Sequence, residues 1–290
     1  MASPELSDPR SARVRRLRRL TRRAARAEEG RFLVEGAQAV REAVRGAVVH
    51  ELLATPDAAL RHDELLAAAA ASGVPLTTMT DQVAAALSET VTPQGLVAVV
   101  DLLDRPLGEV VATAPRLVVV LADVRDPGNA GAVIRVADAA GADAVVLAGD
   151  SVDPYNGKAV RASAGSLFHV PLVNGVGVSE TTTALGRAGL TVLVADGDGE
   201  GDLDAAVADG RLATPTAWVF GNEAWGVSPQ TLAVADQVVR IPIYGAAESL
   251  NLATAAALCL YASARAQRLT ERATERVADE RAPGTNHPTD

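Results

Sequence analysis

The sequence predicts an α/β protein with two domains, on three observations. After residue 116, continuous apolar segments alternate with helical segments, which is typical of a parallel sheet buried on both faces. Before residue 101, a shorter alternation predicts a smaller mixed sheet with helices on it. Between them, residues 102–115 contain Pro106, Gly108 and Pro115 with little apolar periodicity, which predicts a linker.

The first 29 residues predict a basic arm. Residues 1–9 are expected to be disordered, and the segment from Arg10 to Arg26 contains nine arginines in 17 residues. The net charge of −9 at first argues against a nucleic-acid partner, but the local concentration of positive charge predicts a surface for RNA phosphates. A solvated arginine-rich helix without a partner explains the same composition. The arginines that we expect to contact RNA are Arg15, Arg16, Arg19, Arg22 and Arg23.

Residues 30–101 are predicted to form the smaller domain. Its strands are expected at residues 31–35, 48–54, 74–79 and 95–100. Its helices are expected at residues 36–45, 57–71 and 81–87. Because both kinds of element alternate along the chain, we expect the helices to pack on one small sheet.

Residues 116–269 are predicted to form the larger domain, and residues 270–290 a disordered tail. Its strands are expected at residues 117–122, 144–148, 191–195, 217–220 and 238–241. Its helices are expected near residues 130–140, 157–163, 180–188, 202–208, 228–233 and 251–268. Since ligands of parallel sheets bind beyond the carboxyl ends of the strands, the loops directly after these strands are where we expect a site.

Composition excludes several classes of site. The single cysteine, Cys259, lies in an apolar helical segment, so a disulfide within the chain and a multi-cysteine zinc site are both excluded. The four histidines show no paired ligand spacing, so we expect no metal. No apolar run approaches the roughly 20 residues of a membrane span, so no membrane is expected. The N-terminus lacks the apolar segment of a secretory signal, which predicts a cytoplasmic location.

Three segments after predicted strands combine glycine with polar side chains: 126–135 (DPGNAGAVIR), 221–226 (GNEAWG) and 241–253 (IPIYGAAESLNLA). Glycine permits close approach of the backbone to a ligand. Taken singly, Asn129, Ser249 and Asn251 are explained as helix caps, and Arg135 as a surface arginine. Their joint occurrence in this order favours a functional site.

Together the three segments resemble the signature motifs of the SpoU/TrmH family of RNA ribose 2′-O-methyltransferases, over residues 117–268. Residues 153–171 resemble the middle region of that family, and residues 32–36 (FLVEG) resemble its small ribosomal-protein-like substrate-binding domain. With the basic arm, this segment resembles the branch of thiopeptide-resistance enzymes that modify the large ribosomal subunit. The resemblance implies a trefoil-knotted parallel-sheet methyltransferase domain, S-adenosylmethionine as methyl donor, and a homodimer with its active site near the subunit interface.

The resemblance also implies roles for individual residues. Gly221, Ile241 and Leu250 would supply backbone contacts to the donor, with Ala195 as a further candidate. Arg135 would activate the ribose hydroxyl. Since arginine rarely loses its proton, holding a phosphate and orienting the nucleophile is the alternative role. The side chains expected to form one hydrogen-bonded network with Arg135 are those of Asn129, Glu223, Ser249 and Asn251.

Two readings from other classes compete with this one. The acidic segment 196–202 (DGDGEGD) is a weak pattern for a Rossmann-type small-molecule methyltransferase, and an acidic surface turn explains it more simply. An RNA-binding protein that has lost catalysis is the second, and the intact polar residues of the three segments argue against it. We predict methyl transfer to 23S ribosomal RNA, with transfer RNA as the alternative substrate.

Overall fold

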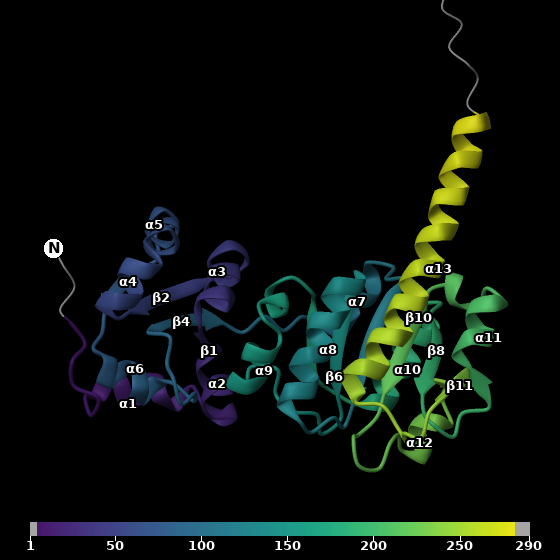
Figure 1. Cartoon of the computed structure of the whole chain (residues 1–290), viewed down its shortest axis with the longest axis horizontal. Coiled ribbons are helices and arrows are strands. Elements are labelled where there is room, and N and C mark those ends of the chain that lie inside the picture. The colour runs from purple at the N-terminus through teal and green to yellow at the C-terminus, as the bar shows by residue number, and fades with distance from the viewer. Residues whose placement is uncertain (1–4, 282–290) are drawn as a thin grey trace, which may run out of the picture.

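The structure is a computed structural model that describes residues 5–281, the side chains of residues 274–281 excepted. Two sheets lie side by side along the long axis of the molecule (Figure 1). The smaller has the order β1-β4-β2-β3, with β3 parallel to β2 and the other pairs antiparallel, which confirms the predicted mixed sheet. Its elements are β1 (Arg31–Glu35), α3 (Ala37–Gly46), β2 (Val49–Ala54), α4 (Pro56–Arg61), α5 (Asp63–Ala71), β3 (Leu76–Thr78), α6 (Asp81–Leu87) and β4 (Leu96–Asp101).

The arginine-rich segment is a folded part of this unit rather than an arm. It forms two helices, α1 (Ala12–Arg19) and α2 (Arg23–Glu29). Three-residue spacing gives α1 an apolar face that is buried in the same cluster as α6. The buried side chains of that face and its end are Val14, Leu17 and Leu20. Leu6 forms a parallel bridge with Met79, so the expected disorder of residues 1–9 is wrong for their described part.

The larger sheet has seven strands in the order β7-β6-β5-β10-β8-β11-β9, and every pair is parallel. Alternate residues of β5 (Leu117–Ala122) belong to two separate buried clusters, one on each face, as a sheet covered on both sides requires. The elements that follow β5 are α8 (Pro127–Ala140), β6 (Ala144–Ala148), α9 (Gly157–Ala162), the short 3₁₀ helix η1 (Ser166–Phe168), β7 (Leu172–Val176), α10 (Val178–Arg187), β8 (Thr191–Ala195), β9 (Gly201–Asp202), α11 (Leu203–Ala208), η2 (Arg211–Ala213), β10 (Thr216–Phe220), α12 (Pro229–Leu232), β11 (Gln237–Arg240) and α13 (Leu252–Arg281).

Two strands of this sheet were not predicted. Strand β7 contains Asn174 and Gly175, which interrupt its apolar pattern, and β9 has only two residues. Both lie at the edges of the sheet, where a strand needs less apolar surface. The expected linker, residues 102–115, does connect the two sheets, but it contains α7 (Leu107–Ala112), whose apolar face is buried against the larger sheet.

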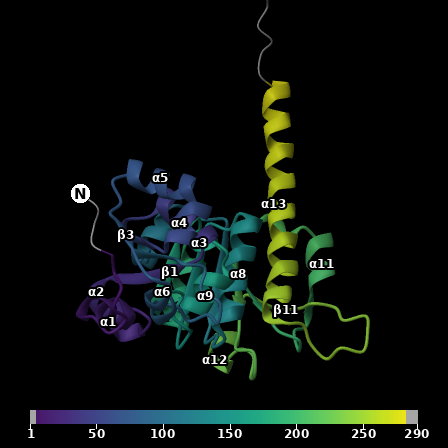
Figure 2. The same ribbon diagram turned by 60° about the vertical axis from the view of Figure 1, so that its left-hand side comes forward.

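Helix α13 packs against α8 and the central strands and then runs past the body of the molecule (Figures 1 and 2). Trp218 of β10 donates through Nε1 to the hydroxyl of Ser263 on this helix, at 2.8 Å. The helix continues to Arg281, so the structure differs from the tail expected from residue 270; residues 282–290 lie outside the described part. Among the described helices, none is long and apolar enough to cross a membrane.

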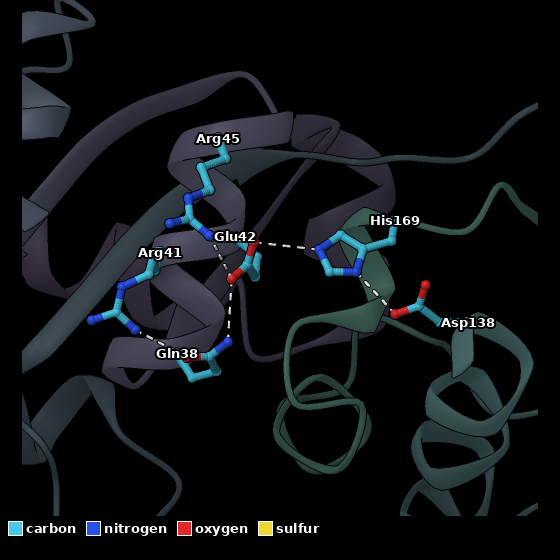
Figure 3. A network of polar contacts seen from close by, with 6 residues as sticks. All are labelled: Gln38, Arg41, Glu42, Arg45, Asp138 and His169. Atoms are coloured by element: carbon cyan, nitrogen blue, oxygen red, sulfur yellow. Dashed lines mark hydrogen bonds and ion pairs between the residues drawn. The ribbon is translucent and has the colours of Figure 1, made fainter. Parts of the chain in front are cut away.

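The two sheets share one buried cluster, which fixes their relative orientation. Phe32 of β1 packs on Tyr155, with ring centroids 4.7 Å apart. Buried Arg26 of α2 donates to Asp153 at 2.9 Å from Nε and 2.5 Å from Nη2. At the surface, His169 lies between Glu42 of α3 and Asp138 of α8 (Figure 3). The contacts across this junction thus combine an apolar cluster, a buried ion pair and a surface contact of His169 with two carboxylates.

Candidate active site

A cavity of 510 Å³ opens at the carboxyl ends of β8, β10 and β11. In a parallel sheet these ends lie at one edge, so the loops that follow them converge. The cavity is lined by residues 195–197, 220–224, 226, 239, 241, 243, 248–252 and 255, and by Asn129 from the start of α8. Residues from all three motifs therefore surround one space, as the sequence predicted.

The loop after β10 is held rigidly. A Cβ added at Gly221 would lie 2.4 Å from the carbonyl oxygen of Gly226, so only glycine fits there. Two backbone hydrogen bonds, both between Asn222 and Gly226, close the loop at 2.8 and 2.9 Å. The side chain of Asn222, only 5% exposed, donates to the carbonyl oxygen of Asp123 at 2.7 Å and ties this loop to the end of β5. Asn222 was not predicted as a site residue, although it stands inside the second motif.

Glu223 is the centre of a hydrogen-bonded network. Its carboxylate accepts from the backbone amides of Arg125 and Asp126, each at 3.3 Å, and from Asn129 Nδ2 at 3.1 Å. The amide oxygen of Asn129 in turn accepts from Asn251 Nδ2 at 3.0 Å. One residue from each of the three motifs is therefore joined in a chain of hydrogen bonds across the cavity mouth.

The start of α8 is anchored by an ion pair. The Asp126 carboxylate accepts from the backbone amide of Asn129 at 2.8 Å and so caps the helix, whereas Asn129, taken singly, was open to explanation as the cap. Lys158 of α9 donates from Nζ to Asp126 at 2.7 Å, and this contact, with the cap bond, lowers the pKa of that carboxyl. Freed from capping, the side chain of Asn129 reaches Glu223 and Asn251.

The predicted site residues outside this network differ in where they lie. The four cofactor candidates all line the cavity: Ala195, Gly221, Ile241 and Leu250. Ser249 also lines it, but no hydrogen bond joins it to the network within the described chain. The expected network around Arg135 is wrong for a single chain: Arg135 is exposed on α8, lies outside the cavity lining and has no hydrogen bond or ion pair with any described residue. The sequence distance of six residues from Asn129 turns the two side chains to different parts of the helix surface.

The arginines expected to contact RNA are all exposed, on α1 and α2. Arg19 is paired with Glu28 at 2.7 Å, whereas the other four, Arg15, Arg16, Arg22 and Arg23, have no ionic partner among the described residues. Arg26, from the same run of arginines, is buried and belongs to the junction. Four unpaired guanidinium groups remain available to an anionic partner.

The acidic segment 196–202 is not a simple surface turn, because Asp196 and Gly197 line the cavity. A Cβ added at Gly199 would lie 2.9 Å from backbone atoms of β11, so the segment packs closely on that strand. Within the described chain, no cluster of His, Cys, Asp and Glu side chains is arranged to hold a metal ion. Burial raises the pKa of the Cys259 thiol, in keeping with its assignment to the core.

The cavity fits the nucleoside part of S-adenosylmethionine. Apolar side chains of Val239, Ile241 and Leu250 line it beside the open backbone at Gly221, which suits an adenine ring. The Asp196 carboxylate at the end of β8 is an acceptor for ribose hydroxyls. Among the described residues, no basic side chain lines the cavity, which agrees with a donor that carries no phosphate.

Comparison with known proteins places the chain in the class of ribosomal RNA methyltransferases with a separate substrate-binding domain. Residues 11–98 match the MRM3-like substrate binding domain. Residues 116–261 match the SpoU rRNA methylase family, and the chain belongs to this family. The predicted enzyme class is thereby confirmed, and the Rossmann-type small-molecule reading is wrong.

Two of three relatives match about nine tenths of the chain, and the third matches 62% of it. The chain is 32% identical over 266 residues to 23S rRNA (guanosine(2553)-2′-O)-methyltransferase RlmP of Bacillus subtilis, covering 89% of this chain and 98% of that protein. It is 37% identical over 183 residues to a 23S rRNA (uridine(2479)-2′-O)-methyltransferase of Streptomyces viridochromogenes, covering 62% and 63%. An AdoMet-bound rRNA methyltransferase of Sinorhizobium meliloti superposes with a TM-score of 0.78 at 29% identity, over 90% of this chain and 97% of that one.

Proposed function

We propose that the protein transfers a methyl group from S-adenosylmethionine to a ribose 2′-hydroxyl of 23S ribosomal RNA. The observation that carries this proposal is the network of Asn129, Glu223 and Asn251 at the mouth of a cavity that suits the donor. The names of the relatives from Bacillus subtilis and Streptomyces viridochromogenes support both the 2′-O position and the 23S substrate. Transfer RNA remains the alternative substrate.

In this proposal the chain binds the donor mainly through backbone groups of Gly221, Ile241 and Leu250, with Ala195 at the end of β8. When bound, S-adenosylmethionine supplies an electrophilic methyl group. Asn129 and Asn251 hold the ribose near it, because both amides also belong to the network that Glu223 fixes. Ser249 lines the same cavity and offers its hydroxyl to the substrate. Holding a weakly acidic hydroxyl in line with the methyl group accounts for a large share of the expected rate gain.

We propose further that the enzyme is a homodimer in which Arg135 acts on the site of the partner subunit. Arg135 is exposed and outside the cavity of its own chain. On the neighbouring α13, Leu258 and Tyr261 are 45% and 53% exposed, and the Tyr261 hydroxyl lies 3.5 Å from the carbonyl oxygen of Ala139 on α8. An exposed apolar strip beside an unpaired arginine suits an isologous interface of two α8 and α13 pairs.

The four unpaired arginines of α1 and α2 are proposed to hold RNA phosphates, as is Arg19 when it exchanges Glu28 for a phosphate. A cytoplasmic location follows from a ribosomal RNA substrate. Membership of the thiopeptide-resistance branch and the trefoil knot both stay predictions. Raised thiopeptide resistance in a sensitive bacterium that expresses the protein would support membership of the resistance branch, and unchanged sensitivity would contradict it.

The test of the proposed function is methyl transfer from labelled S-adenosylmethionine to total bacterial RNA, with wild type beside Asn251→Ala. We expect label in 23S ribosomal RNA at a linkage that resists alkaline hydrolysis, and at least tenfold less label with the variant. Label in transfer RNA would select the alternative substrate. Donor binding without label in any unmodified RNA would contradict the proposal.

The dimer is tested by mixing two variants of low activity, Arg135→Ala and Glu223→Gln. If Arg135 serves the partner's cavity, one of the two sites in each mixed dimer is intact. Random exchange at equal concentrations then restores about a quarter of wild-type activity, since half of the dimers are mixed. No recovery, with exchange verified by differently tagged subunits, would place Arg135 in its own subunit's site.

A further inference from the structure

We infer that a second pocket, between the two domains, binds an unpaired base of the substrate RNA. This inference rests on the proposed function and deepens it, because it names a part of the RNA that the enzyme reads besides the methylated ribose. The pocket has a volume of 230 Å³ and is separate from the cavity at the strand ends, with which it shares no lining residue. It is smaller than the roughly 300–1,000 Å³ of sites for drug-sized ligands, which suits a single base.

The walls of this pocket come from both domains. The smaller domain contributes the end of β1, the start of α3 and the loop that includes Thr90, Thr92 and Gln94. The larger domain contributes Arg161 of α9 and Ala164. At the start of α3, three of the four lining residues are small, namely Gly36, Ala37 and Ala39, and the fourth is Gln38.

Three groups in the pocket have hydrogen-bonding capacity that the described chain does not use. The Gln94 side chain accepts from the backbone amide of Ala37 at 3.1 Å, which leaves its NH₂ group without a partner. The Thr92 hydroxyl has no hydrogen-bond partner among the described residues. Arg161 makes one weak contact, from Nη1 to Glu35 at 3.4 Å, and its remaining guanidinium donors are free within the described chain. The pocket is thus rich in donors and suits a ligand edge rich in acceptors.

The charge of the pocket favours a base over a phosphate. Glu35 is held by the hydroxyls of Ser88 and Thr90 and lies beside Arg161, so its negative charge offsets that of the arginine. The negative charge of this carboxylate would repel a phosphate, whereas a neutral base has no net charge to be repelled. Unpaired bases are the parts of RNA that proteins read in sequence-specific binding, and arginine reads N7 and O6 of guanine most often. We therefore expect guanine to bind best.

Helix α9 connects the pocket to the active site. Lys158 on its first turn holds Asp126 beside the network, and Arg161 one turn later faces the pocket. Three helical residues advance the chain by only about 4.5 Å. A nucleotide close to the target in the folded RNA can therefore occupy the pocket while the target ribose is at the cavity.

The direct test uses uncharged nucleosides and the full chain labelled with ¹⁵N, saturated with S-adenosylmethionine so that the first cavity is filled. Titration with guanosine to millimolar concentration is expected to shift the NMR signals of the Gln94 side-chain amide and the Thr92 backbone amide. Adenosine, cytidine and uridine are expected to give smaller shifts. No shift with any nucleoside, or equal shifts with inorganic phosphate alone, would overturn the inference.

The kinetic test uses two variants. Thr92→Val removes a hydroxyl but keeps the size of the side chain, and Arg161→Lys removes the planar guanidinium group but keeps its positive charge. We expect each to raise the KM for RNA about three- to tenfold, with an unchanged kcat and donor Kd. Thr78→Val is the matched control, because Thr78 is an exposed threonine of the same domain outside every pocket described above. An unchanged KM in both pocket variants would contradict the inference. Failure of the proposed function can be distinguished from failure of this inference. In the first case wild type would transfer no methyl group to RNA, while the nucleoside titration would still report binding to the second pocket.

Discussion

The buried ion pair between Arg26 and Asp153 leads us to predict a large loss in the free energy of unfolding when Arg26 is replaced. Arg26 is 3% exposed and Asp153 7%, and two hydrogen bonds join them. A third, from Arg26 Nη1 to the carbonyl oxygen of Leu20 at 3.0 Å, completes the arginine's contacts. Replacing Arg26 by methionine keeps much of the side chain's volume but leaves the carboxylate of Asp153 buried without its cation.

Removing one partner of a buried pair costs about 3–5 kcal/mol, so we expect Arg26→Met to lower the free energy of unfolding by that amount. The matched control is Arg19→Met, a nearby arginine whose partner Glu28 is exposed. An exposed pair contributes at most about 1 kcal/mol. The double variant Arg26→Met/Asp153→Leu should recover much of the loss, because it leaves no buried charge alone.

The measurement is urea unfolding of the four proteins, followed by fluorescence of Trp218 and Trp225 and by circular dichroism. Equal losses for Arg26→Met and Arg19→Met, both below about 1 kcal/mol, would refute the reasoning. So would a double variant as unstable as Arg26→Met, because the loss would then come from packing rather than from an uncompensated charge.

Three further predictions follow from the same contacts. Hydrogen bonding to Asp138, and more weakly to Glu42, raises the pKa of His169 above its ordinary 6.5. The stabilising effect of the protonated side chain is therefore complete below about pH 6.5 and is lost as pH rises through the raised pKa. The difference in unfolding free energy between wild type and His169→Gln should shrink from pH 5.5 to 8.5, and a difference that grows with pH would contradict this. Glu223→Gln should lower kcat by roughly 10- to 100-fold with little change in donor Kd, because an amide cannot accept all three hydrogen bonds that Glu223 accepts from Arg125, Asp126 and Asn129. A loss confined to donor Kd would place Glu223 in donor binding instead. Changing the four unpaired arginines to glutamine should make the slope of log RNA affinity against log salt concentration less steep by about 3. An unchanged slope would exclude these arginines as the phosphate contacts. Those arginines are Arg15, Arg16, Arg22 and Arg23.

The sequence predicted the parallel sheet and the cavity because both depend on local patterns. Runs of valine and leucine define central strands such as β5 and β10, and parallel strands bring their carboxyl ends to one edge. Side chains directly after those strands, such as Glu223, therefore had to meet. Asp126 caps α8 and also pairs with Lys158, and that contact over 32 residues is one that no local pattern indicates.

Charge patterns were less informative because they do not distinguish a buried arginine from an exposed one. Arg26 belongs to the same run as Arg22 and Arg23, yet its partner Asp153 lies 127 residues away. The exposure of Arg135 on α8 likewise depends on how the chain folds. In both cases tertiary structure decides, and composition alone does not predict it.

The junction has a consequence for how the enzyme recognises its substrate. Helix α8 begins at the network of Asn129 and ends near the contact of Asp138 with His169, while α9 joins Lys158 at the site to Arg161 at the second pocket. Two helices thus run from the methyl-transfer site to the smaller domain, and the connection between the domains is itself packed on the larger sheet. The distance from the arginine-bearing helices to the cavity is therefore set by the fold rather than by a flexible linker. Movement of the two domains apart would expose Arg26 and Asp153, whose burial as a pair opposes it, so the proposed phosphate contacts would keep a fixed distance from the target ribose.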